Sequence, residues 1–467
     1  MDAPPRRMSN VGFLALQVLL VVLAVAAFLG IRWLGESVPV LSATALPPQA
    51  PAHAAFASFL PAILASLAAI LLAARILATI ARRLGQPPVI GEILAGIALG
   101  PSLLGALWPE ASAIVLSDTA LPFLGRLADL GVILFMFLVG LEFDPGQLRG
   151  RGRTAMAVSV AGTAFPFLAG AILALWLHST HGASGISYTV FALFLGTAMS
   201  VTAFPVLARI LADLGLARTD LGALALSSAA VSDVLAWCLL AVVVGFESHH
   251  SDGIATTLGF SALFVAGMLL IGRPLIRWLA ARLGAATEPG DYALMVALAL
   301  MAALITELIG IHPLFGAFLF GVLVPHDSAV AVEARRHMET LVIGLFLPVF
   351  FAWSGLRTQI GLVDGLSQWG VCLAIIAVAF ASKAGGTWLA ARATGMGPRD
   401  ATALGTLMNT RGLVELVVLN VGLDLGVITP TLFSMLVLMA VTTTLATAPI
   451  LRLVLGSRRM SLEFPSR

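Results

Sequence analysis

Long apolar segments recur along the whole chain, and no other feature of the sequence restricts its fold as strongly. A helix that crosses a bilayer needs about 20 predominantly apolar residues, and segments of this kind follow one another up to residue 454. Hydrophobic residues make up 59% of the 467 positions and charged residues only 11%, which is too little polar surface for a water-soluble domain. The sequence therefore predicts an all-α polytopic membrane protein.

The first apolar segment covers residues 11–33 and belongs to an N-terminal region of residues 1–33. Two arginines precede it, as in signal peptides, but the segment is long for such a peptide and lacks a clear cleavage pattern. We therefore expect a retained extra transmembrane helix. A linker rich in proline and alanine follows over residues 34–55.

Thirteen further apolar segments fall in a transmembrane domain predicted over residues 56–456, and residues 457–467 are expected to form a short cytoplasmic tail. Two of the segments are short and rich in glycine, so we expect these helices to be broken or tilted. These two spans are 87–104 and 311–325. The thirteen predicted spans are 57–81, 87–104, 121–142, 154–177, 187–213, 219–246, 256–281, 291–309, 311–325, 339–361, 368–391, 400–423 and 427–454.

Arginine positions predict the orientation of these helices, because cytoplasmic loops carry an excess of Arg and Lys. The opposite loops carry the segments HSTHG and ESHHSDG, whose histidines we interpret as solvated. Fourteen helices with both termini in the cytoplasm satisfy this pattern, and a bacterial inner membrane is the expected location. With a cytoplasmic N-terminus, nearly all the loop arginines fall on that side: Arg82, Arg83, Arg149, Arg151, Arg153, Arg218, Arg282, Arg335, Arg336, Arg399, Arg458 and Arg459.

Two segments far apart in the chain resemble each other. GTAMSVTAFPVLARILADLGL (196–216) and GTLMNTRGLVELVVLNVGLDL (405–425) both begin with Gly-Thr-x-Met. Both also contain a residue that disturbs a helix, Pro205 in the first and Gly412 in the second. The predicted orientation runs the first segment toward the cytoplasm and the second away from it. Interrupted helices of opposite direction indicate an inverted repeat with a transport site, with chance similarity between Ala- and Leu-rich helices as the alternative.

Asp233 is the only charged residue between Asp220 and Glu247. A charge at membrane depth costs about 3 kcal/mol or more, so it indicates a function. Burial favours the protonated form and a nearby cation the charged form, which would let Asp233 exchange a proton for a metal cation. The alternative is a structural ion pair with Arg or Lys. Because hard cations prefer oxygen ligands, we expect oxygens near Asp233 or the predicted breaks to complete a binding site: Ser232, Thr202, Asn409 and Thr410.

Lys383 is the only lysine in the chain and lies near the middle of an apolar segment. A buried lysine can lose its proton, whereas arginine stays charged. Lys383 is therefore either a group that changes charge during a cycle or a fixed counter-ion of Asp233, and the two roles overlap. Arg411 lies beside the second predicted break, where it would compensate helix C-terminal dipoles or a carboxylate such as Glu415.

Three other carboxylates lie in or near the ends of apolar segments. They are Glu92, Glu142 and Glu307. Glu92 and Glu142 either line an approach for cations or pair with an arginine such as Arg126 or Arg209, and Glu307 is open to the same two interpretations. We favour the structural role for all three.

Other classes of function find no support in the sequence. No Walker, dinucleotide-binding, catalytic-serine or metalloprotease motif stands in a credible context, so we expect no enzyme, no cofactor and no resident metal. Cys238 and Cys372 lie in apolar segments, which predicts buried side chains rather than a disulfide or a metal site. A net charge of +2 without a basic tract gives no indication of nucleic-acid binding.

Six motifs, which occur in order between residues 57 and 455, together resemble the second monovalent cation:proton antiporter family. They are most similar to the plant CHX-type cation/proton exchangers and their bacterial relatives. Each motif alone is weak, but the set is specific. The motifs are GEILAGIALGPSLLG, LADLGVILFMFLVGLEFD, SVTAFPVLARILADLGL, LSSAAVSDVLAW, HPLFGAFLFGVLVP and LMNTRGLVELVVLNVGLDLGVI.

The resemblance implies a sodium/proton antiporter-like fold of thirteen helices with two inverted repeats. Crossed, broken helices would fall on 187–213 and 400–423, and the helix at 11–33 would lie outside the common core. A core domain and a dimerisation domain are implied, and with them a homodimer in the lipid bilayer. The family's cation-binding aspartate matches Asp233 and its core lysine matches Lys383, which implies exchange of K⁺ or Na⁺ for H⁺.

Two departures from the family pattern alter these expectations. The residue before the essential aspartate is usually Asp or Asn in the family, but it is Ser232 here. A second carboxylate is linked in the family with exchange of two protons, so its absence favours electroneutral exchange, unless Lys383 itself carries a proton. Related potassium efflux systems have long C-terminal domains, whereas this sequence stops soon after its last span, so we expect no nucleotide-binding domain in the chain.

Antiport of K⁺ or Na⁺ against H⁺ is the function that the sequence favours, with Asp233 binding either a metal ion or a proton. Three alternatives stay open. A cation channel would use the same residues without coupling to protons. An organic-anion symporter would face its substrate with Lys383 or Arg411, and a sensor or scaffold subunit would transport nothing.

Overall fold

The computed structural model describes residues 26, 29–30, 59–117, 120–142, 152–183, 185–217, 219–247, 253–283, 289–310, 312–325 and 327–456. Only three positions of the expected N-terminal helix are among them, and these are helical. The linker over 34–55 and the tail over 457–467 lie outside the described residues. The assignments of these three segments therefore stay predictions.

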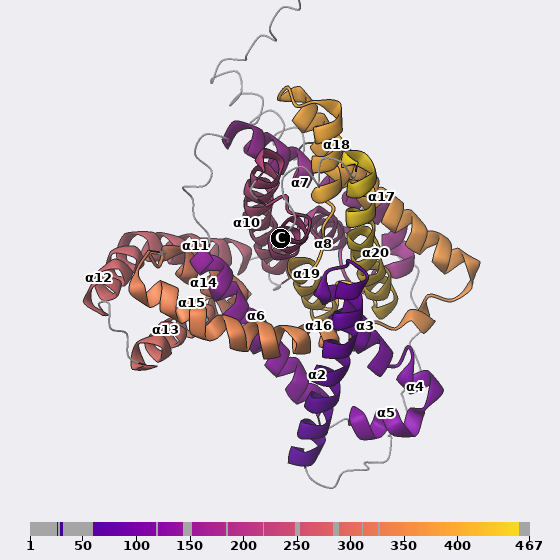
Figure 1. The fold of residues 1–467 in the computed structure, drawn as a ribbon, viewed down its shortest axis with the longest axis horizontal. Helices are drawn as coiled ribbons and strands as arrows, with labels where there is room; N and C mark the ends of the chain where they lie inside the picture. Colours follow the sequence, from indigo (N-terminus) through magenta and orange to yellow (C-terminus); the bar gives the residue numbers. More distant parts are fainter. Residues whose placement is uncertain are drawn as a thin grey trace, which may run out of the picture.

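Helices form nearly all of the described chain (Figure 1). Each of the thirteen predicted spans coincides with a helical segment, which confirms the prediction of an all-α, multi-pass membrane protein. Within the described ranges, nine helices are long and apolar enough to cross a membrane, and three shorter apolar helices accompany them. In chain order the α-helices are α2 (Phe59–Arg83), α3 (Pro88–Leu99), α4 (Leu104–Leu107), α5 (Pro109–Val115), α6 (Leu121–Glu142), α7 (Gly152–His181), α8 (Tyr188–Ser200), α9 (Phe204–Asp213), α10 (Asp220–Glu247), α11 (Gly253–Gly267), α12 (Arg273–Leu283), α13 (Pro289–Ile309), α14 (Pro313–Leu323), α15 (Ala329–Leu341), α16 (Leu347–Leu356), α17 (Gly365–Ala393), α18 (Pro398–Leu407), α19 (Leu413–Asp424) and α20 (Pro430–Leu455).

The helices pack as two bundles. The broken-helix bundle consists of α7 to α10 and α17 to α20, in which α7 packs against both α8 and α17. The glycine-packed bundle consists of α2, α3, α6 and α13 to α16, with α11 packed against α13 and α12 against α15. Figure 1 shows the first bundle around α7, α17 and α20, and the second around α6, α14 and α16.

Two membrane segments of the broken-helix bundle are interrupted near their middle. The first is α8 and α9, joined through residues 201–203, and the second is α18 and α19, joined through residues 408–412. Helices α8 and α19 lie in one buried apolar cluster, whereas α18 packs with Leu207 and Leu211 of α9 in another. Thus α8, the first half of one segment, lies with α19, the second half of the other. In the same way, α18 lies with α9. The two segments therefore run in opposite directions, as the inverted repeat predicts.

Glycines bring the helices of the other bundle into close contact. A Cβ atom on Gly96 of α3 would lie 2.0 Å from the backbone oxygen of Ala352 in α16. A Cβ atom on Gly321 of α14 would lie 2.4 Å from the backbone oxygen of Phe137 in α6. Any larger residue at either glycine would force the helices apart. The α3–α16 and α14–α6 pairs are thus both held in close contact by a glycine in one of the short spans.

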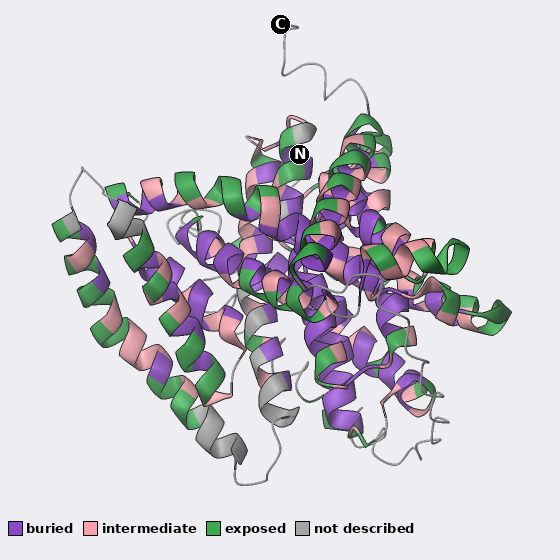
Figure 2. Ribbon diagram, turned by 90° about the horizontal axis from the view of Figure 1, so that it is seen from below, coloured by how far each residue is buried: buried purple, intermediate pink, exposed green. Residues whose placement is uncertain are grey.

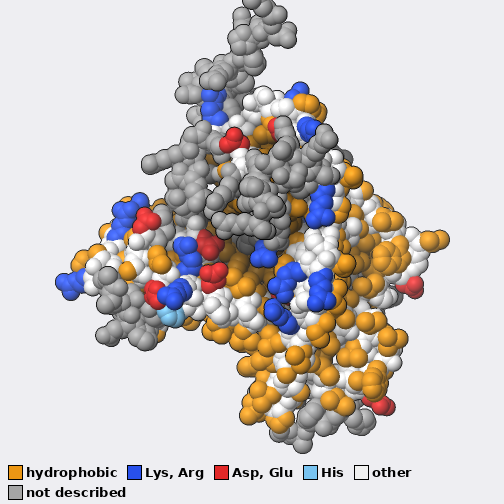
Figure 3. Space-filling view, viewed as in Figure 1, with side chains coloured by type: hydrophobic (Ala, Val, Ile, Leu, Met, Phe, Trp, Pro, Cys, Tyr) orange, Lys and Arg blue, Asp and Glu red, His pale blue; other side chains and the backbone are white. Residues whose placement is uncertain are grey.

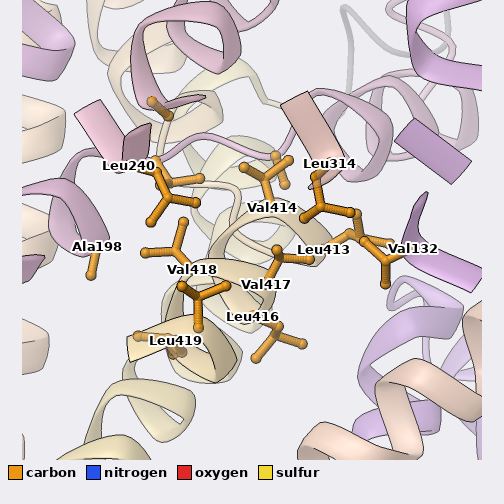
Figure 4. Packing of buried hydrophobic residues seen from close by; sticks show 14 of the residues in the cluster. Val132, Ala198, Leu240, Leu314, Leu413, Val414, Leu416, Val417, Val418 and Leu419 are labelled. Carbon is orange, nitrogen blue, oxygen red and sulfur yellow. The ribbon is translucent and has the colours of Figure 1, made fainter. Parts of the chain in front are cut away.

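Helix α19 lies at the centre of the molecule, and every residue from Leu413 to Gly422 is buried. A helix that is apolar on all sides needs other elements around it. Figure 2 shows that burial falls off toward the outer helices. Figure 4 shows the α19 side chains among residues of four other helices: Val132 of α6, Ala198 of α8, Leu240 of α10 and Leu314 of α14.

The interpretation of His178, His181 and Cys238 from sequence is wrong. The two histidines, expected in a solvated loop, lie in the last turn of α7 and are 3% and 5% exposed. His178 Nε2 lies 3.0 Å from the backbone oxygen of Ile186, and His181 Nε2 lies 2.9 Å from Gln368 Oε1. Helix α7 extends beyond its predicted end, so protein groups replace water around both rings. Cys238, expected to be buried, is exposed on α10.

Candidate functional site at the helix crossing

The first break separates α8 from α9 at residues 201–203. Val201 and Ala203 have extended backbone conformations, and Pro205 is the second residue of α9. A proline has no amide hydrogen for the helical bond to the residue four positions earlier, which disfavours continuation of α8 but suits the first turn of α9, where no such bond is needed. The interruption predicted from Pro205 is therefore confirmed, and it lies just before the proline.

The second break separates α18 from α19 at residues 408–412. The Thr410 hydroxyl and the Asn409 amide both donate to carbonyl oxygens in the last turn of α18. Such side chains compete with the backbone for the bonds that would continue a helix. Gly412 immediately precedes α19, so the interruption predicted at this residue is also confirmed.

The two breaks are hydrogen-bonded to each other. The Ala203 amide donates to the Thr410 carbonyl at 2.9 Å, and the Thr202 hydroxyl donates to the Met408 carbonyl at 3.1 Å. Four helix ends therefore meet at the crossing: the C-termini of α8 and α18, and the N-termini of α9 and α19. Helix C-termini carry partial negative charge and N-termini partial positive charge. Basic side chains at the crossing are therefore expected to face a helix C-terminus, and acidic side chains a helix N-terminus.

Arg411 faces the C-terminus of α8. The residue is 1% exposed, and its guanidinium donates to the carbonyl oxygens of Ala198 at 3.0 Å and Met199 at 2.8 Å. It also forms an ion pair of 2.7 Å with Glu415, which is fully buried in the first turn of α19. The arginine thus contacts both groups that the sequence analysis named for it, a helix C-terminus and the Glu415 carboxylate.

Lys383 of α17 also faces the C-terminus of α8. The side chain is fully buried, and Nζ donates to the Ser200 carbonyl oxygen. Lys383 and Asp233 interact electrostatically. However, the ion pairs between described residues do not include one that joins them directly. The lysine is close enough to influence the carboxylate without occupying its oxygen atoms.

Asp233 lies on α10 and is 5% exposed. The backbone amide of Phe204, at the N-terminus of α9, donates a hydrogen bond to its carboxylate, and a helix N-terminus favours negative charge. The other side of the carboxylate is different, because Oδ1 is buried and has no hydrogen-bond partner. Since buried polar atoms are normally paired, this oxygen indicates a place for a ligand.

Two of the other expected ligands have the same property. Ser232 Oγ and Asn409 Oδ1 are buried without a partner. Thr202 and Thr410 differ, because their hydroxyl groups donate to backbone carbonyls at the breaks. Helix α10 packs against α8, α9 and α18, so the unpaired oxygens come from elements in contact. Together with Asp233 they suit an alkali cation or a proton. The described residues form no His, Cys, Asp or Glu cluster for a resident metal.

The remaining membrane carboxylates belong to the glycine-packed bundle. Glu92 is partly buried on α3 and interacts electrostatically with Arg82. Glu142, at the end of α6, and Glu307, on α13, are exposed. Arg126, suggested as a partner for Glu92 or Glu142, instead forms its ion pair with the aspartate three residues later on α6. None of these residues is brought to the crossing.

Sequence reasoning missed three hydroxyl groups. Thr163 of α7, Ser228 of α10 and Thr387 of α17 have buried side-chain oxygens without partners. Thr387 follows Lys383 by four residues and Ser228 precedes Ser232 by four, so each lies on the same helix face as a predicted site residue. That spacing could have identified these two, whereas no local pattern singles out Thr163.

Comparison with protein families gives a match over most of the chain. The family described as "Sodium/hydrogen exchanger, transmembrane" matches residues 67–455. The Na(+)/H(+) antiporter NhaS4 of Synechocystis is 42% identical over 392 residues, which cover 83% of this chain and 96% of the relative. Cation/H(+) antiporter 18 of Arabidopsis thaliana is 40% identical over 399 residues, covering 85% of this chain. The alignment spans about half of the plant protein, 49% of its length.

Two more distant proteins are also similar. The K(+)/H(+) antiporter 1 of Saccharomyces cerevisiae is 36% identical over 297 residues, which cover 61% of this chain and 34% of the yeast protein. Among solved structures, the sodium proton antiporter MjNhaP1 of Methanocaldococcus jannaschii matches with a TM-score of 0.62 at 17% identity. That match covers 87% of this chain and 99% of the archaeal one. At this identity the similarity concerns the fold, and it confirms the fold expected from the sequence motifs.

Proposed function

Because this chain belongs to the sodium/hydrogen exchanger family of cation:proton antiporters, we propose that it is a secondary active antiporter that exchanges Na⁺ or K⁺ for H⁺. Its family consists of transporters rather than enzymes. The named relatives include a Na(+)/H(+) antiporter and a K(+)/H(+) antiporter, which supports a monovalent cation as the transported ion. The observation that carries the proposal is the unpaired Asp233 oxygen at the crossing of two broken helices.

Asp233 binds either the alkali cation or a proton, and this exclusive occupancy couples the two gradients. Ser232 and Asn409 supply further oxygen ligands from their unpaired atoms. Thr202, through its hydroxyl, and Thr410, through its backbone carbonyl, hold the two breaks together. Lys383 stabilises the carboxylate when no cation is bound, and Arg411 compensates the end of α8. With Asp233 as the only carboxylate that binds the ion, the exchange is one for one and electroneutral when Lys383 keeps its proton throughout the cycle. Loss of the lysine proton on cation binding would instead make it two protons for one cation.

Alternating access follows from movement between the two bundles. Within the transmembrane domain over 56–456, the broken-helix bundle serves as the core that carries the ion, and the glycine-packed bundle serves as the scaffold through which two copies form a homodimer. The protein lies in a bacterial inner membrane with both termini in the cytoplasm. The loop arginines support this orientation, because they gather on one side of the predicted topology.

The test uses everted vesicles from a host that lacks its own antiporters. The interior is acidified and followed with a pH-sensitive dye while K⁺, Na⁺ and then choline are added. We expect one alkali cation to dissipate the proton gradient with wild type, and the response to vanish with Asp233→Asn. The matched control is Glu307→Gln, which removes an exposed carboxylate from another helix and should leave exchange unchanged.

The same vesicles distinguish the alternatives. Cation flux that ignores the proton gradient would replace antiport with a channel. Proton-driven uptake of an organic anion, without a response to alkali cations, would replace it with symport. Normal exchange in folded Asp233→Asn protein would refute the assignment of the aspartate while leaving the antiport reaction in place.

A further inference from the structure

A cavity away from the crossing is lined by arginines from three separate segments. It has a volume of about 260 Å³ and lies between the turn that joins α2 to α3, helix α9 and the last turns of α20. Its basic residues are Arg82, Arg209 and Arg452, and no acidic residue appears in the described lining. Figure 3 shows basic side chains gathered near the middle of one face of the molecule.

The backbone beside the cavity accommodates one of these arginines closely. Gly85 has φ +69°, a conformation that residues with a side chain rarely adopt, and a Cβ atom there would lie 3.2 Å from Arg452 Nη2. Gln86 also lines the cavity and donates through Nε2 to the Leu445 carbonyl. Its other polar atom, Oε1, is buried and has no partner. The turn thus contributes Gly85 and Gln86 to the lining, with Gly85 beside the Arg452 guanidinium.

The charges of the cavity favour an anion. Arg82 is partly offset by Glu92, which interacts with it electrostatically from outside the described lining. Arg209 and Arg452 reach the cavity from the other bundle, and Arg209 also interacts with another residue of the protein. Guanidinium groups bind phosphate oxygens with two parallel hydrogen bonds. Since a water molecule takes about 30 Å³, the cavity holds a phosphoryl group together with several waters.

We propose that this cavity binds a phosphoryl group, supplied either by inorganic phosphate or by the head group of an anionic phospholipid. The bound group links the α2–α3 turn of the glycine-packed bundle to α9 and α20 of the broken-helix bundle. The proposed function requires the two bundles to move relative to each other. On that function, a phosphoryl group bound in the cavity slows the exchange of cations for protons. Binding itself does not depend on that function, so the two can fail separately.

Binding is tested with the purified full-length protein, without any transport assay. Thermal unfolding is followed in neutral detergent with millimolar inorganic phosphate or with chloride at matched ionic strength. In parallel it is followed in phosphatidylcholine nanodiscs with or without phosphatidic acid. A ligand that binds only the folded state raises the melting temperature. We expect Arg452→Gln to weaken the response by about tenfold in apparent affinity, as for loss of one charge-assisted partner.

Arg83→Gln is the matched control. Arg83 is the neighbour of Arg82, is exposed at the same helix end and does not line the cavity. It should leave the response unchanged, whereas Arg452→Lys, which keeps the charge but loses the paired geometry, should give an intermediate affinity. The lysine variant also covers the case in which Arg452→Gln fails to fold.

Stabilisation by inorganic phosphate would identify a soluble ligand, and stabilisation only by phosphatidic acid would identify a lipid head group. Either result supports the site if Arg452→Gln or Arg452→Lys weakens it and Arg83→Gln does not. Absence of stabilisation with both probes would overturn the proposal. Equal weakening by Arg83→Gln and the Arg452 variants would also overturn it, because the effect would then reflect the general basic surface.

Discussion

Arg411 and Lys383 are both buried at the crossing, but their charges are held differently. Arg411 meets two carbonyl oxygens and the Glu415 carboxylate, so its charge is matched by several fixed groups. Lys383 donates to a single carbonyl oxygen and acts on Asp233 through space. The arginine therefore holds the end of α8. In the proposed exchange cycle, the lysine is the cation whose charge changes with occupancy of Asp233.

Arg411→Leu should destabilise the protein strongly, because it leaves the buried Glu415 carboxylate without its partner. Breaking a buried ion pair costs about 3–5 kcal/mol. The double variant Arg411→Leu with Glu415→Leu should recover part of this loss, since no uncompensated charge remains. The measurement is the melting temperature of purified protein. Additive losses in the double variant would show that the pair is not coupled.

Lys383→Arg should fold but lose exchange by about tenfold or more, since arginine stays protonated where lysine can lose its proton. A permanent cation near Asp233 would compete with the transported ion at every pH. The measurement is the pH profile of exchange in everted vesicles. Arg392→Lys, at the exposed end of the same helix, is the control. Exchange near the normal rate in Lys383→Arg would reduce the lysine to a fixed counter-ion.

The sequence predicted only part of the candidate site at the helix crossing. A lone carboxylate and a lone lysine in apolar segments attract attention, because each is costly at membrane depth. The sequence did not predict the partner of either group. Lys383, for example, donates a hydrogen bond to the carbonyl of Ser200, which lies 183 residues earlier in the chain. Unpaired oxygens such as Thr163 Oγ1 are recognised only when all neighbours are placed.

At the scale of elements, glycines decide how closely helices approach. Gly96 lets α3 contact the backbone of α16, and Gly321 does the same for α14 and α6. Lipid offers apolar side chains as good an environment as the protein interior, so close packing at small residues contributes much of the association between membrane helices. Glycine positions in the two short spans are therefore part of the architecture.

Gly96→Ala should lower stability by about 1–3 kcal/mol, the usual cost of forcing extra atoms into a packed contact. Gly370→Ala is the matched control, because a Cβ atom at Gly370 of α17 meets nothing within 4 Å. It should be neutral or slightly stabilising, since alanine favours helix over glycine. The measurement is the melting temperature of both variants, and we expect it to be lower for Gly96→Ala than for Gly370→Ala. Equal melting temperatures would contradict the role assigned to Gly96.

Elements were the most predictable level of the structure, because hydropathy alone locates spans. All thirteen spans and both interruptions appear where the sequence placed them. Boundaries were less certain: α7 continues past residue 177 to His181, where contacts with Gln368 replace the expected solvent. Such an extension depends on packing between distant segments, which hydropathy does not report.

At the scale of the whole molecule, a polar cluster at the end of α16 and on α19 links the two bundles. Arg357 donates to Asn420 at 3.0 Å and forms an ion pair of 2.5 Å with Asp424. Asn420 in turn donates to Ser354 at 2.7 Å. A movement of the broken-helix bundle against the other bundle would have to break these contacts.

Cross-linking Ser354→Cys to Asn420→Cys should therefore stop exchange. The background carries Cys238→Ala and Cys372→Ala, and copper phenanthroline drives the oxidation. A reducing agent should restore the rate, because it frees the bundles again. Fluorescence-detected exchange before oxidation, after oxidation and after reduction gives the three values to compare.

A cross-link within the glycine-packed bundle is the control. Ser102 donates to the Thr358 carbonyl at 2.7 Å, so Ser102→Cys and Thr358→Cys test oxidation without joining the two bundles. This variant should keep its exchange rate when oxidised. Undiminished exchange in fully cross-linked Ser354→Cys and Asn420→Cys protein would refute movement between the bundles at this contact.

Neither half of the chain can complete the crossing alone. Lys383 and Arg411 of the second half hold the carbonyls at the end of α8, and Thr202 of the first half holds the Met408 carbonyl. A half-length ancestor would therefore have needed another copy of itself, inserted upside down in the same membrane, to satisfy these groups. Joining two such copies in one gene would have freed each from serving both orientations, so that their sequences could diverge.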